Sequence, residues 1–398
     1  MDKAKGHYDT ACLLFKNGKV DQAIRELNIA IKINPNYADA HLILGIALSR
    51  KGLLDGAIKQ YKEAIKINPE NASAHNNLGL ALSDKGLLEE AIHEFKEALR
   101  INPKNVSAHT NLGVIFKAKG LLDDAIIEMR EALRINPNVA EAHYNLGNYL
   151  RDKGQLDEAI KEFSEAIKLN PNIAQAHNNL GSILKIKGRR NDALKEFREA
   201  LKVNPKNPLV YLKLGIFYSE EGKYNQAIEE FIKAIKIQPK FAEAHDNLGI
   251  AYSMKGLLNE AIKEYNEALR INPNISSTHS HLGIALARKG RYTDAIMEFK
   301  KALNLDPNHS EAHYNLGMVY SEKSMHDEAI EEYKTTIKID PKFSSAHFNL
   351  GSTLRYKGHL TEAIEAYQNF IKVAPPQKSE LIEAANKAIR EIKKKLNK

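Results

Sequence analysis

The stretch that decides the fold runs from Ala140 to Ile173 and reads AEAHYNLGNYLRDKGQLDEAIKEFSEAIKLNPNI. Its small and apolar residues recur at intervals of three and four in two segments, which is typical of two helices that each bury one stripe. Gly154 lies between the segments and Pro171 follows the second, where helices commonly end. The stretch therefore predicts a helical hairpin.

The same pattern recurs along almost the whole chain of 398 residues. Eleven prolines lie 34 residues apart, from Pro35 to Pro375. With each proline at position 32 of a repeat, eleven repeats run from 4–37 through 344–377. A fixed period of this length predicts an array in which each repeat buries its apolar face on its neighbours. We therefore expect one solenoid over residues 1–377.

Recurring residue types indicate how the two predicted helices of a repeat pack. Position 8 is Gly in ten repeats and position 20 is Ala in all eleven, whereas position 24 holds a bulky side chain such as Phe163. We expect the small residues to let the two helix axes approach closely, with the bulky side chain between them. Position 15 is Gly in ten repeats, with Ser324 as the exception, and is expected to end the first helix in a left-handed conformation.

With these positions in place, the repeat resembles the tetratricopeptide repeat. The resemblance covers residues 4–377 and implies an all-α, right-handed superhelical solenoid of eleven helix pairs, whose first helices line a concave groove. The aromatic residue usual at position 4 in this family is His in ten repeats, as in AHNNLG from Ala74 to Gly79. That His, together with Asn-Leu-Gly, is similar to repeats in the targeting arm of O-GlcNAc transferases. Only 21 residues follow the last repeat, so we expect no glycosyltransferase domain.

Residues 378–398 are expected to form a basic capping helix. Ser379 is the candidate N-cap, and lysines crowd the last turn, where cations suit the helix dipole. One predicted apolar stripe comprises Leu381, Ala385, Ala388 and Ile392. We expect this stripe to cover the apolar face of the last repeat.

Composition and charge exclude several classes of protein. The longest apolar run near the start, residues 11–15, is too short for a signal peptide or a membrane span, so we expect a soluble, cytoplasmic protein with no membrane insertion. The single cysteine, Cys12, cannot form an internal disulfide. Half of the net charge of +8 comes from residues 378–398, and no Arg-rich stripe with interleaved aromatic residues occurs elsewhere. We therefore expect no nucleic acid as a partner.

No catalytic constellation is found. Neither a GxxxxGK phosphate-binding loop nor a GxSxG nucleophile elbow occurs. Ten of the 15 histidines lie at position 4, and a residue repeated in this way indicates packing, with a ring nitrogen satisfied locally. His309 and His313 flank Glu311 in the order HSEAH, which is not the HExxH of zinc sites. We therefore expect no enzyme activity, no metal and no cofactor.

The candidate site is the face of the first helices, where the resemblance implies a concave wall. Position 6 is Asn in seven repeats, and a similar Asn ladder contacts extended peptides in O-GlcNAc transferases. A carboxamide offers a donor and an acceptor, so it can pair with peptide groups without selecting their side chains. The alternative is that these side chains only hydrogen-bond along their own helix. The seven residues are Asn77, Asn111, Asn145, Asn179, Asn247, Asn315 and Asn349.

Charged residues of the same face are expected to differ along the array. Position 12 of repeats four to six carries Lys117, Arg151 and Lys185. Later repeats carry the acidic residues Glu243, Asp246 and Glu311. The summed charge is close to zero, which is unsuited to phosphate backbones, and the later repeats are expected to prefer basic peptides. Position 5 holds no Lys, so the carboxylate clamp of chaperone cofactors is not expected.

These observations predict a non-enzymatic protein-interaction scaffold that binds extended segments of other proteins in its concave groove. The alternative that the resemblance leaves open is a detached targeting or regulatory subunit of an enzyme complex, such as a glycosyltransferase. The partners are therefore expected to be other proteins or extended peptides.

Overall fold

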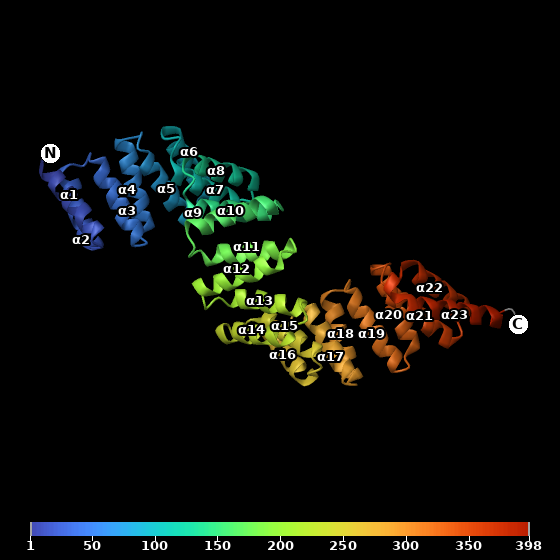
Figure 1. The fold of residues 1–398 in the computed structure, drawn as a ribbon. Coiled ribbons are helices and arrows are strands. Elements are labelled where there is room, and N and C mark those ends of the chain that lie inside the picture. The colour runs from blue at the N-terminus through green and yellow to red at the C-terminus, as the bar shows by residue number, and fades with distance from the viewer. Residues whose placement is uncertain (1, 397–398) are drawn as a thin grey trace. The chain divides into compact units, whose positions relative to one another are not determined.

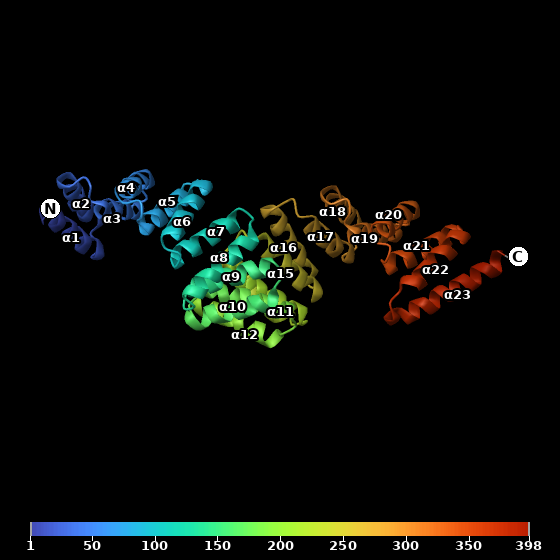
Figure 2. The same cartoon turned by 90° about the horizontal axis from the view of Figure 1, so that it is seen from above.

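The computed structural model describes residues 2–396, and within that range it contains 23 α-helices, one short 3-10 helix and no β-strand. The chain divides into two compact units, Met1–Pro205 and Lys206–Lys398, which we call the N-terminal and C-terminal units. The division falls at the end of repeat six, between the helix pairs of repeats six and seven. Helices follow one another in antiparallel pairs along each unit (Figures 1 and 2). The predicted all-α fold is confirmed, and the prediction of one solenoid over residues 1–377 stays a prediction.

The N-terminal unit consists of six helix pairs. The first helices of the pairs are α1 (Asp2–Lys16), α3 (Ala38–Arg50), α5 (Ala72–Asp84), α7 (Val106–Ala118), α9 (Ala140–Asp152) and α11 (Ala174–Ile186). The second helices are α2 (Val20–Ile33), α4 (Leu54–Ile67), α6 (Leu88–Ile101), α8 (Leu122–Ile135), α10 (Leu156–Leu169) and α12 (Arg190–Val203). Each second helix from α2 to α10 also packs against the first helix of the next repeat, so the core continues from pair to pair.

The C-terminal unit consists of five helix pairs and a terminal helix. The first helices are α13 (Pro208–Glu220), α15 (Ala242–Met254), α17 (Ser276–Arg288), α19 (Ser310–Glu322) and α21 (Ser344–Lys357). The second helices are α14 (Tyr224–Ile237), α16 (Leu258–Ile271), α18 (Tyr292–Leu305), α20 (His326–Ile339) and α22 (Leu360–Val373). The 3-10 helix η1 (Pro376–Lys378) leads into α23 (Ser379–Leu396), which packs on α22.

The two helices of a repeat meet where the glycine at position 8 faces the bulky residue at position 24. A Cβ atom on Gly147 would lie 2.9 Å from the ring of Phe163, which is completely buried. In the C-terminal unit a Cβ atom on Gly215 would lie only 2.4 Å from the ring of Phe231. Real Cβ atoms do not approach other atoms so closely. The predicted close approach of the helices is therefore confirmed.

The first helices end as predicted. The ten glycines at position 15 have φ angles between 70° and 84°, in the left-handed region. Ser324 takes this position in repeat ten with φ at 60°, and no other non-glycine residue in the described range has a positive φ. A side chain in this region has a conformational cost that glycine avoids.

The terminal helix α23 covers α22, with two differences from the prediction. Its buried residues are Ala385, Ala388, Ile389 and Ile392. Leu381 is 39% exposed, because the stripe that contacts α22 begins at Ile382 and Leu381 lies at its edge. Ser379 is not the N-cap either: it is the first residue of α23 and already has helical angles, since η1 precedes it.

A hydrogen-bonded pair joins the two helices of most repeats. In repeat four, His109 Nδ1 lies 2.6 Å from Glu128 Oε2, and Nε2 lies 3.2 Å from the carbonyl oxygen of Pro103. Because a carbonyl oxygen only accepts, Nε2 carries a proton, and the carboxylate favours a second proton on Nδ1. The same pair, His at position 4 with Glu at position 23, occurs in eight repeats, and repeat two uses Gln60 instead.

These pairs confirm the predicted local satisfaction of the histidine rings. They also place the carboxylate of position 23 next to the core. The Glu298 side chain is only 8% exposed, and its Oε2 lies 2.6 Å from His279 Nδ1. The carboxylate lies beside the buried stripe because the ring it binds is itself in the core.

The His–Glu pairs predict a pH-dependent stability. The hydrogen bond to Glu128 raises the pKa of His109, and burial only partly offsets it. The pKa of His177 is raised in the same way by Glu196. Since the folded pKa of His109 and His177 exceeds the unfolded value of about 6.5, these two pairs stabilise the fold fully below that pH and lose their effect as pH rises through the folded pKa.

We therefore expect the urea midpoint, followed by circular dichroism, to fall as pH is raised from about 6 to 8. A variant with Glu128→Gln and Glu196→Gln should show a weaker pH dependence, because each amide keeps an acceptor oxygen but removes the charge. A midpoint that is constant or rises over this range would contradict the stabilising role of the pairs.

The helix spacing predicts opposite effects for two glycine substitutions in the N-terminal unit. Gly147→Ala should reduce the free energy of unfolding by about 1–2 kcal/mol, because overpacking against Phe163 outweighs the gain in helix propensity. Gly6→Ala is the control: a Cβ atom there has nothing within 4 Å, so the substitution should stabilise by about 0.5–1 kcal/mol. Urea denaturation of both variants tests this, and stabilisation by both would show that the contact tolerates a methyl group.

Candidate functional site

The first helices of successive repeats lie side by side within each unit. Contacts join α1 to α3, α3 to α5, α5 to α7 and α7 to α9, and likewise join α13, α15, α17, α19 and α21 in succession. We call the side chains at repeat positions 2, 5, 6, 9, 12 and 13 of these helices the first-helix surface. It carries all the residues predicted from the sequence as binding residues.

Position 5 contributes less to this surface than predicted. Asn76, Asn178 and Ser280 are buried there. The reason is that position 5 lies against the next first helix: Asn111 Nδ2 donates to Asn76 Oδ1 at 3.2 Å, which joins position 6 of one repeat to position 5 of the preceding repeat. The predicted binding face is therefore partly occupied by contacts between repeats.

The seven asparagines at position 6 are all half-buried, and they fall into three groups. Asn77 and Asn247 donate to the carbonyl oxygen four residues earlier in their own helices. Asn111, Asn179 and Asn349 donate to a polar side chain of the preceding repeat, namely Asn76, Asn148 and Tyr314. The structure gives Asn145 and Asn315 no side-chain hydrogen bond within residues 2–396. The alternative of hydrogen bonding along the own helix therefore holds for Asn77 and Asn247, whereas contact of the column with a peptide stays a prediction. The seven side chains do not share one hydrogen-bonding pattern.

A hollow of about 240 Å³ opens on the first-helix surface of the C-terminal unit. It is lined by Met318, Ser321 and Glu322 of α19, by Asn349 and Ser352 of α21, and by Tyr333 of α20. Apolar, hydroxyl, amide and carboxylate groups thus converge at one position of the predicted site. Of the sequence-predicted residues, only Asn349 is among them.

The positive row at position 12 is partly neutralised. Asp152 Oδ2 lies 2.5 Å from Lys117 Nζ, and Asp152 Oδ1 lies 3.0 Å from Arg151 Nη2. Burial works to raise the pKa of Asp152, but the hydrogen bonds and charges of Lys117 and Arg151 outweigh it, so the pKa is lowered. Asp152 therefore remains ionised between the two cations. Lys185, the third residue of the row, is half-buried on α11.

The acidic residues of the later repeats differ in their availability. Asp246 Oδ1 lies 3.0 Å from His281 Nδ1, again joining position 5 to position 6 of the next repeat, and its side chain is 14% exposed. Glu243 and Glu311 are exposed at position 2. The structure therefore leaves two of the three predicted carboxylates open to solvent.

The sequence did not indicate the polar partners of the asparagines. Asn148, Asn178 and Tyr314 lie at positions 5 and 9, whose residue types change from repeat to repeat. Asn178 Nδ2 donates to Asn179 Oδ1 at 3.2 Å, and Asn178 Oδ1 is buried without a partner in the described chain. Because the residue types at these positions vary between repeats, the sequence alone gives no indication of their hydrogen bonds. The contacts follow only from the structure, in which neighbouring repeats are stacked.

Two further findings limit the chemistry of the site. Among residues 2–396, no group of three or more His, Cys, Asp or Glu side chains could hold a metal ion. Every helix in that range is also too short or too polar to cross a lipid bilayer.

Repeated helix pairs with a polar face on their first helices define an α-helical repeat protein. Sequence profiles described as TPR repeat match residues 13–52, 50–86, 81–120, 147–188, 181–220 and 217–256. Profiles described as tetratricopeptide repeat match residues 106–139, 129–161, 242–275, 274–342 and 332–365. The chain therefore belongs to the tetratricopeptide repeat family, whose members are general protein-interaction scaffolds.

Solved structures of three proteins illustrate the similarity. YrrB, a TPR protein with an unusual peptide-binding site, is 27% identical over 46% of this chain and 95% of its own, with a TM-score of 0.42. MamA is 30% identical over 42% of this chain and 92% of its own, with a TM-score of 0.40. Yeast Tom70 is 16% identical over 98% of this chain and 96% of its own, with a TM-score of 0.48. No curated protein sequence matches this chain. The similarity to O-GlcNAc transferase repeats stays a prediction.

Proposed function

We propose that this protein is a non-enzymatic scaffold that holds extended peptide segments of other proteins on its first-helix surface. Membership of the tetratricopeptide repeat family supports the general role. The observation that carries the proposal is the hydrogen-bonding state of the asparagines at position 6. Their side chains are half-buried on helices that contact one another in succession, so they are held in place on one face.

These asparagines offer mainly acceptor oxygens. In Asn77, Asn111 and Asn247 the Nδ2 group already donates within the protein, and no group of residues 2–396 donates to the Oδ1 atom. A carboxamide oxygen can accept two hydrogen bonds. The groups that suit these oxygens are the backbone N–H groups of an extended peptide, which are free when the peptide has no helix or sheet of its own.

Asn145→Ala and Asn315→Ala test the role of the column directly. Neither side chain has a hydrogen bond to another side chain or to backbone in the described range, so each variant should change the free energy of unfolding by only about 0.5 kcal/mol. Each should weaken binding about fivefold, the equivalent of one lost hydrogen bond. The probe is a peptide selected from a displayed random library on the full chain, with affinity measured by calorimetry.

Asn28→Ala provides the control for these variants. Asn28 lies on a second helix, is exposed and donates to Ile24 of its own helix, so its loss should leave binding unchanged. If Asn145→Ala and Asn315→Ala bind the selected peptides as tightly as Asn28→Ala does, the asparagine column is not the binding site.

We also propose that the C-terminal unit prefers basic peptides. Glu243 and Glu311 are exposed on α15 and α19, and complementary charges raise the rate of association. Reversing both to Lys should slow association of a Lys-rich peptide and weaken its salt dependence. The control reverses Glu229 and Glu331, which are exposed on second helices and change the net charge equally. Equal association rates for the two double variants, measured by stopped flow, would contradict this preference.

The second candidate function is a targeting or regulatory subunit of an enzyme complex such as a glycosyltransferase. It rests on the His and Asn-Leu-Gly pattern of repeats such as 72–105. Purification of the full chain from its native cells, followed by assay of the co-purified material for glycosyl transfer, distinguishes the two candidates. A stable complex with such an activity would favour the second candidate.

A further inference from the structure

The last repeat lacks the carboxylate that satisfies the histidine in eight other repeats. Position 23 of repeat eleven is Ala366. His347 Nε2 lies 3.0 Å from the carbonyl oxygen of Pro341, and the histidines of eight other repeats make the same contact with their own proline. His347 Nδ1 has no partner among the described residues. The His347 residue is only 6% exposed. A nearly buried ring therefore retains one unused nitrogen.

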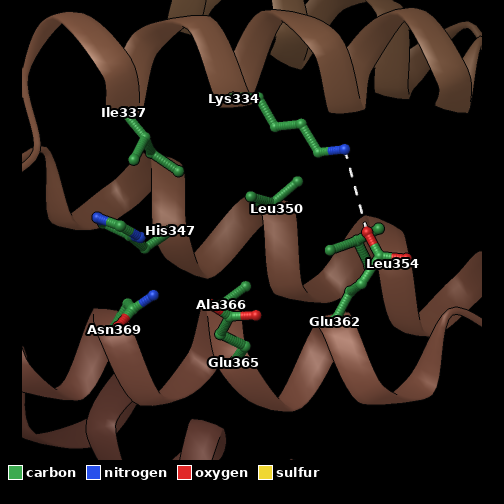
Figure 3. A pocket seen from close by; sticks show the side chains of 9 residues that line it. All are labelled: Lys334, Ile337, His347, Leu350, Leu354, Glu362, Glu365, Ala366 and Asn369. Atoms are coloured by element: carbon green, nitrogen blue, oxygen red, sulfur yellow. Dashed lines mark ion pairs between the residues drawn. The ribbon is translucent and has the colours of Figure 1, made fainter.

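A hollow of about 210 Å³ lies where the missing side chain would be, between α20, α21 and α22. Figure 3 shows His347 and Asn369 at one end of this hollow and Lys334 with Glu362 at the other. Ala366 lies in its wall, together with apolar groups of Ile337, Leu350 and Leu354. The hollow thus combines apolar groups with an unpartnered nitrogen of a nearly buried ring. Ligand pockets usually combine an apolar lining with a few polar groups in this way.

The other repeats indicate which ligand fits. In eight repeats a Glu carboxylate occupies this place, with its Oε2 atom 2.5–2.7 Å from Nδ1 of the histidine. Alanine lacks the last four heavy atoms of glutamate, which are a carbon and a carboxylate group. Those four atoms have the composition of acetate. We propose that repeat eleven contains a carboxylate-binding site in which His347 Nδ1 donates to a ligand of this size.

The surrounding charges are compatible with this ligand. Lys334 Nζ lies 4.0 Å from Glu362 Oε2, and His359 Nδ1 lies 3.1 Å from Glu362 Oε1, so Glu362 faces two cationic or protonatable groups. Glu365, at position 22, also lines the hollow, and its side chain is exposed. A carboxylate at position 22 does not prevent a hydrogen bond between the histidine and a second carboxylate. Repeat ten has Glu331 at position 22, and His313 Nδ1 still lies 2.5 Å from Glu332 Oε2. The site lies beside α22, the second helix of repeat eleven. It does not depend on the function proposed for the first-helix surface.

Acetate is the probe for this site. Ring signals of the histidines in the full chain are followed by NMR at mildly acidic pH during titration with sodium acetate, with sodium chloride at equal ionic strength as the reference. His347→Asn assigns the signal. We expect the His347 signal to shift saturably with a dissociation constant of about 1–10 mM, because so small a ligand has little binding energy available.

Two variants provide matched controls. Ala366→Glu restores the internal carboxylate, so the acetate response of His347 should disappear. Glu332→Ala removes the carboxylate of repeat ten, so His313 should acquire a response that the wild-type protein lacks. Circular dichroism checks that each variant is folded. If Ala366→Glu does not fold, Glu332→Ala still tests whether a histidine that lacks its internal carboxylate binds acetate. Failure of His347 to respond, or an equal response in folded Ala366→Glu, would overturn the proposal.

A blocked glutamate, acetylated at its amino group and amidated at its carboxyl group, distinguishes two sources of the carboxylate. Binding of acetate alone supports a free small carboxylate as the ligand. Binding of both probes supports an acidic side chain of a partner protein, because the peptide backbone must then fit outside the hollow. Both results support a carboxylate site, and binding of neither would contradict it.

Discussion

The contact between the residue at position 8 and the residue at position 24 sets the spacing of every helix pair. In ten repeats a Cβ atom on the glycine would lie 2.4–3.0 Å from the side chain opposite, so no larger residue fits without movement. Repeat one differs from the other repeats at both positions of this contact: Ala11 takes the place of the glycine, and Leu27 takes the place of the larger side chain. The constraint therefore acts on the combined size of the two residues, and the stacking of one pair on the next depends on it.

The helix pairs were predictable from the sequence because the same residue types recur at fixed intervals. Position 15 required a left-handed residue, and even Ser324 adopts that conformation in the structure. The sequence alone did not predict that Leu381 would be exposed, because a helical stripe defines a face but not the angle at which α23 crosses α22. Crossing angles depend on how side chains of both helices interdigitate.

The candidate site was only partly predictable. Its place on the first helices followed from the pattern, but its hydrogen bonds join neighbouring repeats through residues that vary, such as Asn76 and Tyr314. The His–Glu pairs were missed for a different reason. A glutamate beside the buried stripe looks like an ordinary surface residue, although position 23 is Glu or Gln in ten repeats and position 22 varies widely. The contrast between the constant position 23 and the variable position 22 could have indicated the His–Glu pairs.

The ring at position 24 passes beneath the glycine of the first helix, so its far end reaches the opposite side of that helix. Where the ring is tyrosine, the hydroxyl group emerges there: Tyr333 Oη lies 3.2 Å from Ser321 Oγ, and Tyr367 donates to Ser352 Oγ at 3.1 Å. Burial raises the pKa of Tyr333 to about 12, so the hydroxyl keeps its proton and remains a donor. Phenylalanine fills the same space in other repeats without that group. Exchange of Phe and Tyr at position 24 can therefore alter the polarity of the first-helix surface one repeat at a time. The spacing of the two helices stays the same.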